Sequence, residues 1–98
     1  MSKPISGKLR ALVLRRTDCD SGVIDRLAQE HGLEIVYTVV TDTTPQLAAL
    51  IAIHHMLESD AEAVVVPHLT EDEVRRNRSW QLVVTLTRLV TAVGVVDR

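Results

Sequence analysis

The stretch Lys8–Leu14, which reads KLRALVL, ends in a continuous apolar run. Such a run is typical of a strand that is buried on both faces. A polar turn follows over Arg15–Asp20, and Asp20 or Ser21 is placed to cap a helix that ends at Gly32. The apolar positions of this helix recur on one of its faces and are Val23, Ile24, Leu27 and Ala28.

The pattern then repeats. The β-branched segment Leu33–Val40, LEIVYTVV, predicts a second strand. Thr44 followed by Pro45 predicts the start of a helix that runs to about Glu58. This helix is apolar almost all round, so we expect it to be deeply packed. A third buried strand is predicted over Ala61–Val66, which reads AEAVVV.

The last quarter of the chain is ambiguous. Thr70 and Glu73 form a capping box that opens a helix carrying an arginine cluster. We expect helix to about Thr87 and a short strand over Leu89–Val96. The alternative is that this region is mostly strand, because LVVTLT also has high strand propensity.

Strands that alternate with helices predict an α/β class fold. We expect a small three-layer α/β/α domain with a mainly parallel four-stranded sheet, resolvase-like or flavodoxin-like, over residues 8–98, after a flexible N-terminus over residues 1–7. In such sheets ligands bind beyond the carboxyl ends of the strands. We therefore expect three loops to lie together at the carboxyl edge of the sheet, and these are Arg15–Ser21, Thr41–Thr44 and Pro67–Thr70.

Composition narrows the class of protein. Of the 98 residues, 46% are hydrophobic with one Trp, one Tyr and no Phe, so the core must be aliphatic. Cys19 is the single cysteine, which excludes an internal disulfide. No apolar run approaches the roughly 18 residues of a membrane span, so we expect a cytoplasmic protein that binds no membrane. The net charge of −2 argues against a general nucleic-acid binder.

The charge is unevenly distributed. Five basic residues and no acid occur within residues 1–17, and Arg75, Arg76 and Arg78 form a second basic group. If the fold brings the two groups together, a local positive patch results. The alternative is a solvated surface of alternating charge, which a charge run alone more often indicates.

The first turn is a candidate anion site. Backbone N–H groups and the helix dipole at a helix N-terminus attract anions, and the guanidinium groups there add to this. The candidate residues share this sheet edge and are Arg15, Arg16, Thr17, Ser21, Asp42 and His68. The alternative is that Ser21 caps the helix while the arginines pair with Asp18 and Asp20. No glycine-rich phosphate loop is present, so nucleotide binding has no positive signal.

The order of motifs resembles the catalytic domain of the serine recombinases, the resolvases and invertases. The first strand is followed by the motif R-x-T, formed by Arg15 and Thr17. The second strand is followed by Asp42, and the apolar helix and the strand AEAVVVP come next in the same order. The similarity covers roughly residues 8–75. By this resemblance Thr17 takes the place of the nucleophilic serine and Arg15 that of a catalytic arginine. The chain would be a degenerate, truncated member.

Residues that the resemblance requires for catalysis are missing. After the third strand, acids of the stretch His68–Glu73 stand where the family has arginines. Phosphoryl transfer depends on positive charge around the reacting group. We therefore expect a non-catalytic binding or regulatory module, without a cofactor and with weak nucleic-acid binding at best. An enzyme that uses Thr17 and Arg15 is the less favoured alternative.

A structural homodimer or protein-interaction domain is the second hypothesis and is favoured over the enzyme. Trp80 is expected in the core; if it lies outside instead, Trp80, Val83, Val84 and Leu86 would form an interface for a partner. Among the histidines, His54 shares a helix face with apolar residues and is expected to be packed. No histidine stands at ligand spacing from a second ligand, so no metal site is expected.

Overall fold

The structure is a computed structural model that describes residues 8–96. These residues form five strands, β1 (Leu9–Arg15), β2 (Leu33–Val40), β3 (Ala63–Val65), β4 (Arg88–Thr91) and β5 (Gly94–Val96). They also form the helices α1 (Ser21–His31), α2 (Pro45–Ser59), α3 (Glu71–Arg76) and α4 (Arg78–Leu86). The flexible terminus predicted for residues 1–7 lies outside the described residues.

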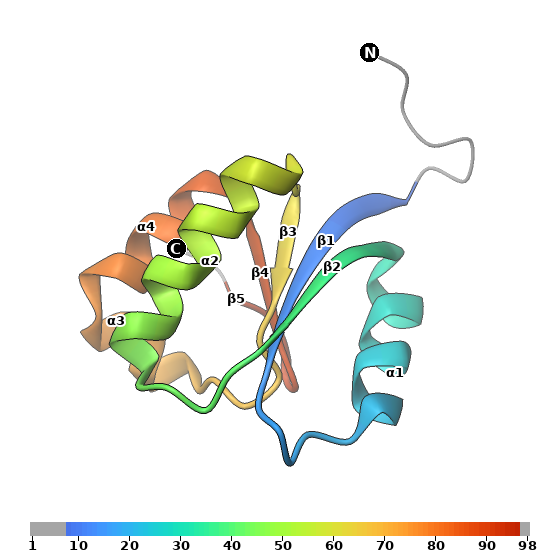
Figure 1. Ribbon diagram of the computed structural model, residues 1–98, viewed down its shortest axis with the longest axis horizontal. Helices are drawn as coiled ribbons and strands as arrows, with labels where there is room; N and C mark the ends of the chain where they lie inside the picture. Colours follow the sequence, from blue (N-terminus) through green and yellow to red (C-terminus); the bar gives the residue numbers. More distant parts are fainter. Residues whose placement is uncertain (1–7, 97–98) are drawn as a thin grey trace.

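The strands form one sheet in the order β2-β1-β3-β4-β5. The first four run parallel, and β5 pairs antiparallel with β4. Helix α1 covers one face, whereas α2, α3 and α4 cover the other (Figure 1). The α/β class and the mainly parallel sheet are therefore confirmed, with five strands where four were expected.

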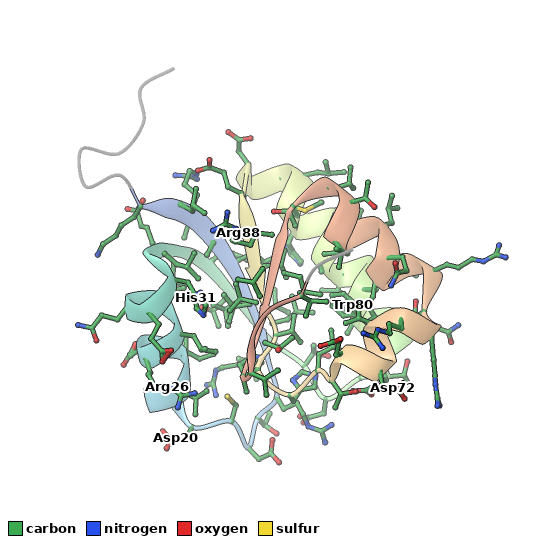
Figure 2. All side chains as sticks on the ribbon, turned by 180° about the vertical axis from the view of Figure 1, so that it is seen from behind. Asp20, Arg26, His31, Asp72, Trp80 and Arg88 are labelled. Carbon is green, nitrogen blue, oxygen red and sulfur yellow. The ribbon has the colours of Figure 1, made fainter. Side chains whose placement is uncertain are left out.

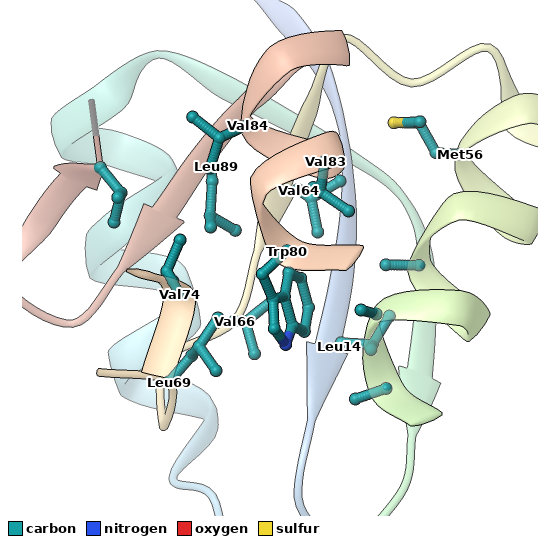
Figure 3. Packing of buried hydrophobic residues seen from close by; sticks show 14 of the residues in the cluster. Leu14, Met56, Val64, Val66, Leu69, Val74, Trp80, Val83, Val84 and Leu89 are labelled. Carbon is teal, nitrogen blue, oxygen red and sulfur yellow. The ribbon is translucent and has the colours of Figure 1, made fainter. Parts of the chain in front are cut away.

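Two apolar cores sandwich the sheet. Successive residues of β1 point to opposite faces, so Ala11 and Val13 join the core under α1 while Leu12 and Leu14 join the core under α2 to α4. This double burial explains the continuous apolar run of the sequence. In the larger core Trp80 lies fully buried among aliphatic side chains (Figure 3).

The predicted helix boundaries depend on short local motifs, and these are confirmed. Asp20 caps α1, and Gly32 ends it in the left-handed region with φ 64°. Thr44 caps α2, and its side chain accepts a hydrogen bond from a backbone N–H of the first turn. Thr70 and Glu73 form the capping box of α3.

The helix end predicted near Thr87 is confirmed, but the region holds two helices and two strands where one of each was predicted. Asn77, with extended φ of −118°, ends α3, and its side chain accepts the backbone N–H of Ser79 to open α4. This side-chain hydrogen bond competes with helix continuation. The predicted strand over Leu89–Val96 is a hairpin of β4 and β5, which Gly94 permits by adopting φ 124°.

The composition of α2 predicted a helix that is packed on all sides, and this prediction is wrong. Its buried residues face the sheet and are Ala48, Ala49, Ala52 and Met56. Leu47, Leu50 and Leu57 point away and stay about half exposed or more. His54 lies on this outward side, with its Nε2 3.3 Å from Oε1 of Glu58, so its predicted packing is also wrong.

Charged side chains project outward on both sides of the sheet. Seen from behind, Asp20 and Arg26 lie on the α1 side, while Asp72 and the buried Trp80 lie on the other (Figure 2). Across residues 8–96, none of the helices combines the length and apolar character needed to cross a membrane.

Candidate functional site

The chain leaves β1 and β3 toward opposite faces of the sheet. These strands are neighbours, yet β1 leads into α1 on one face and β3 leads into α3 on the other (Figure 1). Ligands of open α/β sheets bind beyond the carboxyl ends of the strands where such connections diverge. An open crevice of about 260 Å³ lies at this point. It is lined by Arg16, Asp18, Cys19, Asp20, Val23, Pro67, His68 and Ala92.

A larger hollow of about 650 Å³ lies at the opposite edge of the sheet. It forms at the amino ends of β1 and β4, beside Leu9, Arg88 and Glu62. The polar groups of Glu62 are engaged there, because its carboxylate accepts the backbone N–H of Arg10 at 3.2 Å and its carbonyl accepts that of Arg88 at 3.3 Å. Because ligands of open α/β sheets bind at the carboxyl ends of the strands, the crevice between β1 and β3 is the better candidate.

Two of the predicted anion-binding groups, the Arg15 guanidinium and the backbone N–H groups at the start of α1, already have partners within the first loop. Nη1 of Arg15 donates to the carbonyl oxygens of Cys19 at 3.1 Å and Arg16 at 3.4 Å, so its guanidinium braces the turn. The carboxylate of Asp20 accepts the backbone N–H of Gly22 at 2.9 Å and thereby occupies the N-terminus of α1. Ser21 is an exposed first residue of the helix and not its cap.

Thr17 and Asp42 are bound to each other. The backbone N–H of Thr17 donates to Oδ1 of Asp42 at 3.0 Å, and its hydroxyl donates to Oδ2 at 2.7 Å. These two hydrogen bonds hold the pKa of the Asp42 carboxyl below its usual value, and the nearby charge of Arg16 lowers the pKa further. The carboxylate therefore occupies the position in which an external anion would meet Thr17.

Arg16 is the cation of the crevice. Its Nε lies 3.6 Å from Oδ1 of Asp18 and 4.0 Å from Oδ1 of Asp42, near the outer limit of an ion pair. The Arg16 side chain is 45% exposed and that of Asp18 is 80% exposed, so water screens the attraction. The guanidinium of Arg16 is thus only weakly held by the protein's own acids.

His68 presents an imidazole to the crevice from the loop after β3. Its Nδ1 is buried and has no hydrogen-bond partner. Burial lowers the pKa of His68, and the Arg16 charge lowers it further, against the opposing charges of Glu73, Asp18 and Asp42. An unpartnered buried nitrogen costs free energy, which a hydrogen bond formed when the loop adjusts around a ligand would offset.

Two of the six predicted anion-site residues line the crevice, and Thr17 and Asp42 are brought together beside it. Arg16 and His68 line the crevice, whereas Arg15, Thr17 and Asp42 are engaged in bonds of their own beside it. Sequence reasoning missed the apolar wall, which is formed by Cys19, Val23, Pro67 and Ala92. Pro67 carried a signal, since it directly follows the third strand, but Ala92 belongs to the turn of a hairpin that was predicted as one strand.

Two of the three arginines of the second basic group are neutralised on α3, whereas Arg78 lies exposed at the start of α4. Arg75 pairs with Glu71 at 2.6 Å, and Arg76 pairs with Asp72 at 3.2 Å, each four residues apart. These pairs are exposed, and none of their residues lines the crevice. The arrangement matches the interpretation of a solvated surface with alternating charge.

The predicted interface residues are mostly unavailable to a partner. Trp80, Val83 and Val84 are buried in the core of the protein itself, and only Leu86 is exposed. The interface hypothesis for these three side chains is therefore wrong, whereas the expected core position of Trp80 is confirmed. In the part of the chain that the structure describes, no group of three or more His, Cys, Asp or Glu residues is arranged to hold a metal ion.

Comparisons of the chain with protein-family models, with curated proteins and with solved structures find no match. The crevice geometry is accordingly the basis on which a function can be assigned.

Proposed function

We propose that the protein is a non-catalytic binding module of recombinase-like fold that takes a small organic anion in the crevice between β1 and β3. The observation that carries the proposal is the position of the crevice, at the divergence of two parallel strands, with Arg16 and His68 on its wall. A cytoplasmic site of action is part of the proposal.

The lining indicates the chemistry of the ligand. The guanidinium of Arg16 suits a carboxylate or a phosphate ester. The apolar wall beside it suits a compact apolar body, and the volume of about 260 Å³ holds roughly nine water-sized groups at about 30 Å³ each. This volume lies just below the usual range of about 300–1,000 Å³ for ligand sites. A small apolar acid therefore fits better than inorganic phosphate.

The bonds around Thr17 favour binding over catalysis. A nucleophilic hydroxyl needs a base that can take its proton, but the lowered pKa of Asp42 makes that carboxylate a weak base. Phosphoryl transfer also needs several cations around the reacting group, whereas Arg16 is the one cationic side chain among the described lining residues. A strand-exchange enzyme would form a covalent adduct with nicked DNA that Thr17→Ala abolishes, and we expect no adduct.

An amide NMR titration with benzoate and with inorganic phosphate tests the proposal. We expect shifts confined to residues 16–20, to the loop after β3 and to Ala92, and tighter binding of benzoate because of the apolar wall. Arg16→Ala should abolish these shifts. Arg26→Ala is the matched control, since Arg26 is an exposed arginine on α1 that pairs with Glu30.

A second variant sharpens the test. Asp18→Ala removes the nearer acid beside Arg16 and should strengthen benzoate binding about twofold to fivefold, the equivalent of one exposed ion pair. If benzoate and phosphate shift none of these amides, or shift them equally in Arg16→Ala, the proposal is wrong. Shifts with a short DNA duplex that vanish at moderate salt would indicate only non-specific attraction.

A further inference from the structure

Helices α2 and α4 lie side by side on one face of the sheet (Figure 1). Both helices carry exposed leucines. On α2, Leu47, Leu50 and Leu57 are 49%, 56% and 72% exposed. On α4, Leu82 and Leu86 are 47% and 54% exposed. We call the surface formed by these five residues the leucine face.

The two helices contribute to one continuous surface. A groove of about 310 Å³ separates their first turns and is lined by Leu47 and Leu50 from α2 and by Ser79 from α4. Leu82 and Leu86 follow Ser79 by three and seven residues, so they lie on the same side of α4 as the groove. Monomeric proteins rarely leave a contiguous apolar patch of more than a few hundred Å² in water, so this surface is suited to a partner.

The composition of α2 points the same way. A helix that is apolar all round is normally buried on all sides. Here the sheet and α4 cover one side, with Ala48, Ala52 and Met56, while the other side faces water. A partner on the leucine face would complete the burial that the sequence of α2 requires.

The spacing of the outward residues of α2 suits a second copy of this chain as the partner. Leu47, Leu50, His54 and Leu57 are separated by three, four and three residues, a pattern that reads the same in both directions. A second copy turned about a two-fold axis level with Ala52 therefore places Leu47 opposite the partner's Leu57 and Leu50 opposite the partner's His54. Such self-matching is what a two-fold interface needs.

The charges at the two ends of the leucine face are complementary in this arrangement. Arg78 begins α4, directly before Ser79 of the groove, and is exposed. Glu58 lies near the end of α2, and its side chain is 62% exposed. The same two-fold axis brings position 58 of one copy beside position 46 of the other, where the groove begins, so Arg78 meets the partner's Glu58.

We propose that the leucine face binds a second copy of this chain in an antiparallel two-fold arrangement. A stable interface of standard size buries about 800 Å² on each partner. Five leucines that are about half exposed or more cover only part of this area, so we expect a weak dimer with a Kd that is roughly micromolar.

Sedimentation equilibrium over a range of protein concentrations tests the proposal. The wild type should pass from monomer to dimer, and Leu50→Glu should raise the Kd at least about tenfold, because it places a charge in the centre of the face. Val93→Glu is the matched control, since Val93 is 85% exposed but lies in the turn between β4 and β5, and the Kd should not change. A wild type that stays monomeric overturns the proposal and leaves a different protein as the partner of this face.

A charge exchange tests the arrangement itself. Arg78→Glu and Glu58→Arg should each weaken the homodimer roughly threefold to tenfold. An equimolar mixture of the two variants should dimerise as well as the wild type, because each contact then joins opposite charges. Both substitutions suit the dipoles of their helix ends, so both variants should fold. A mixture no stronger than the single variants, or dimerisation of Leu50→Glu at the wild-type Kd, overturns the antiparallel pairing.

Discussion

Trp80 links α4 to α2, and its replacement is the most direct test of the fold. The indole is fully buried in the core shown in Figure 3. Its Nε1–H donates to the carbonyl oxygen of Pro45, the first residue of α2, at 2.8 Å. The substitution Trp80→Ala therefore removes both an apolar anchor and a tie between two helices.

The expected loss follows from these two contributions. Replacing a buried Trp by Ala typically costs about 3–5 kcal/mol, including the cavity left behind. The hydrogen bond accounts for about 1 kcal/mol of this, which is the part that Trp80→Phe should lose together with a small packing defect. A domain of this size has a free energy of unfolding of roughly 5–15 kcal/mol, so Trp80→Ala should lie close to the limit of folding.

Urea unfolding followed by far-UV circular dichroism measures the effect without the tryptophan signal. Thr85→Ala is the control, because Thr85 is exposed on the same helix, and its free energy of unfolding should change by less than about 0.5 kcal/mol. A loss below about 1 kcal/mol for Trp80→Ala would show that the indole is not in this core. That result would also return Trp80 to the surface as an interface residue.

Three further substitutions test individual contacts. Asp42→Asn should flatten the decline in stability below about pH 4, which thermal unfolding against pH measures. The Asp42 carboxyl has a pKa below its ordinary value of 3.8, so its ionised form stabilises the fold above pH 3.8. That contribution is lost as the pH falls through the lowered pKa. The wild type should lose stability as the pH falls below 6.5, because the lowered pKa of His68 means that protonation favours the unfolded chain. His68→Gln should remove this loss. The same scans would show no difference between the two proteins if His68 were exposed. Asn77→Ala should cost about 1 kcal/mol in urea unfolding through loss of the cap of α4, and an unchanged midpoint would contradict that role.

The boundaries of α1 and α2 could be predicted because short contiguous motifs determine them. Asp20 and Gly32 enclose α1, and Thr44 with Pro45 opens α2. Each motif satisfies backbone groups of its own helix end, so its effect does not depend on distant residues. The continuous apolar run of β1 was equally informative, because burial on both faces of a sheet removes the alternation.

The last quarter resisted prediction because its signals compete at short range. Asn77 stands within a run of arginines that favours helix, and only the structure shows its side chain accepting the N–H of Ser79. Gly94 is one glycine in a valine-rich segment, compatible with either a bulged strand or a hairpin. The exposure of the outward leucines of α2 could not be predicted for a different reason. Tertiary packing, and not the sequence of the helix itself, decides which of its sides is covered.

The position of the candidate site at this sheet edge was predictable, but most of its lining residues and their partners were not. The sequence placed Arg15, Arg16 and Thr17 at a sheet edge where donors meet anions. It could not show that Asp42, 25 residues away, would accept both hydrogen bonds of Thr17, nor that the guanidinium of Arg15 would turn into its own loop. The long-range pairing of β1 with β2 brings Asp42 there, and local patterns do not encode it.

The crevice and the leucine face lie on different sides of the sheet, which determines how they interact. The crevice opens beside α1, against the loop that contains Cys19, whereas the leucine face lies on α2 and α4. A dimer built on the leucine face leaves both crevices accessible and makes no contact that a ligand could change, and allosteric coupling requires such a differential contact. Benzoate should therefore bind with the same Kd below and above the protein concentration at which the dimer forms, and Leu50→Glu should bind it as the wild type does. A benzoate affinity that changes with dimerisation would show that α1 and its loop move when α2 and α4 are covered.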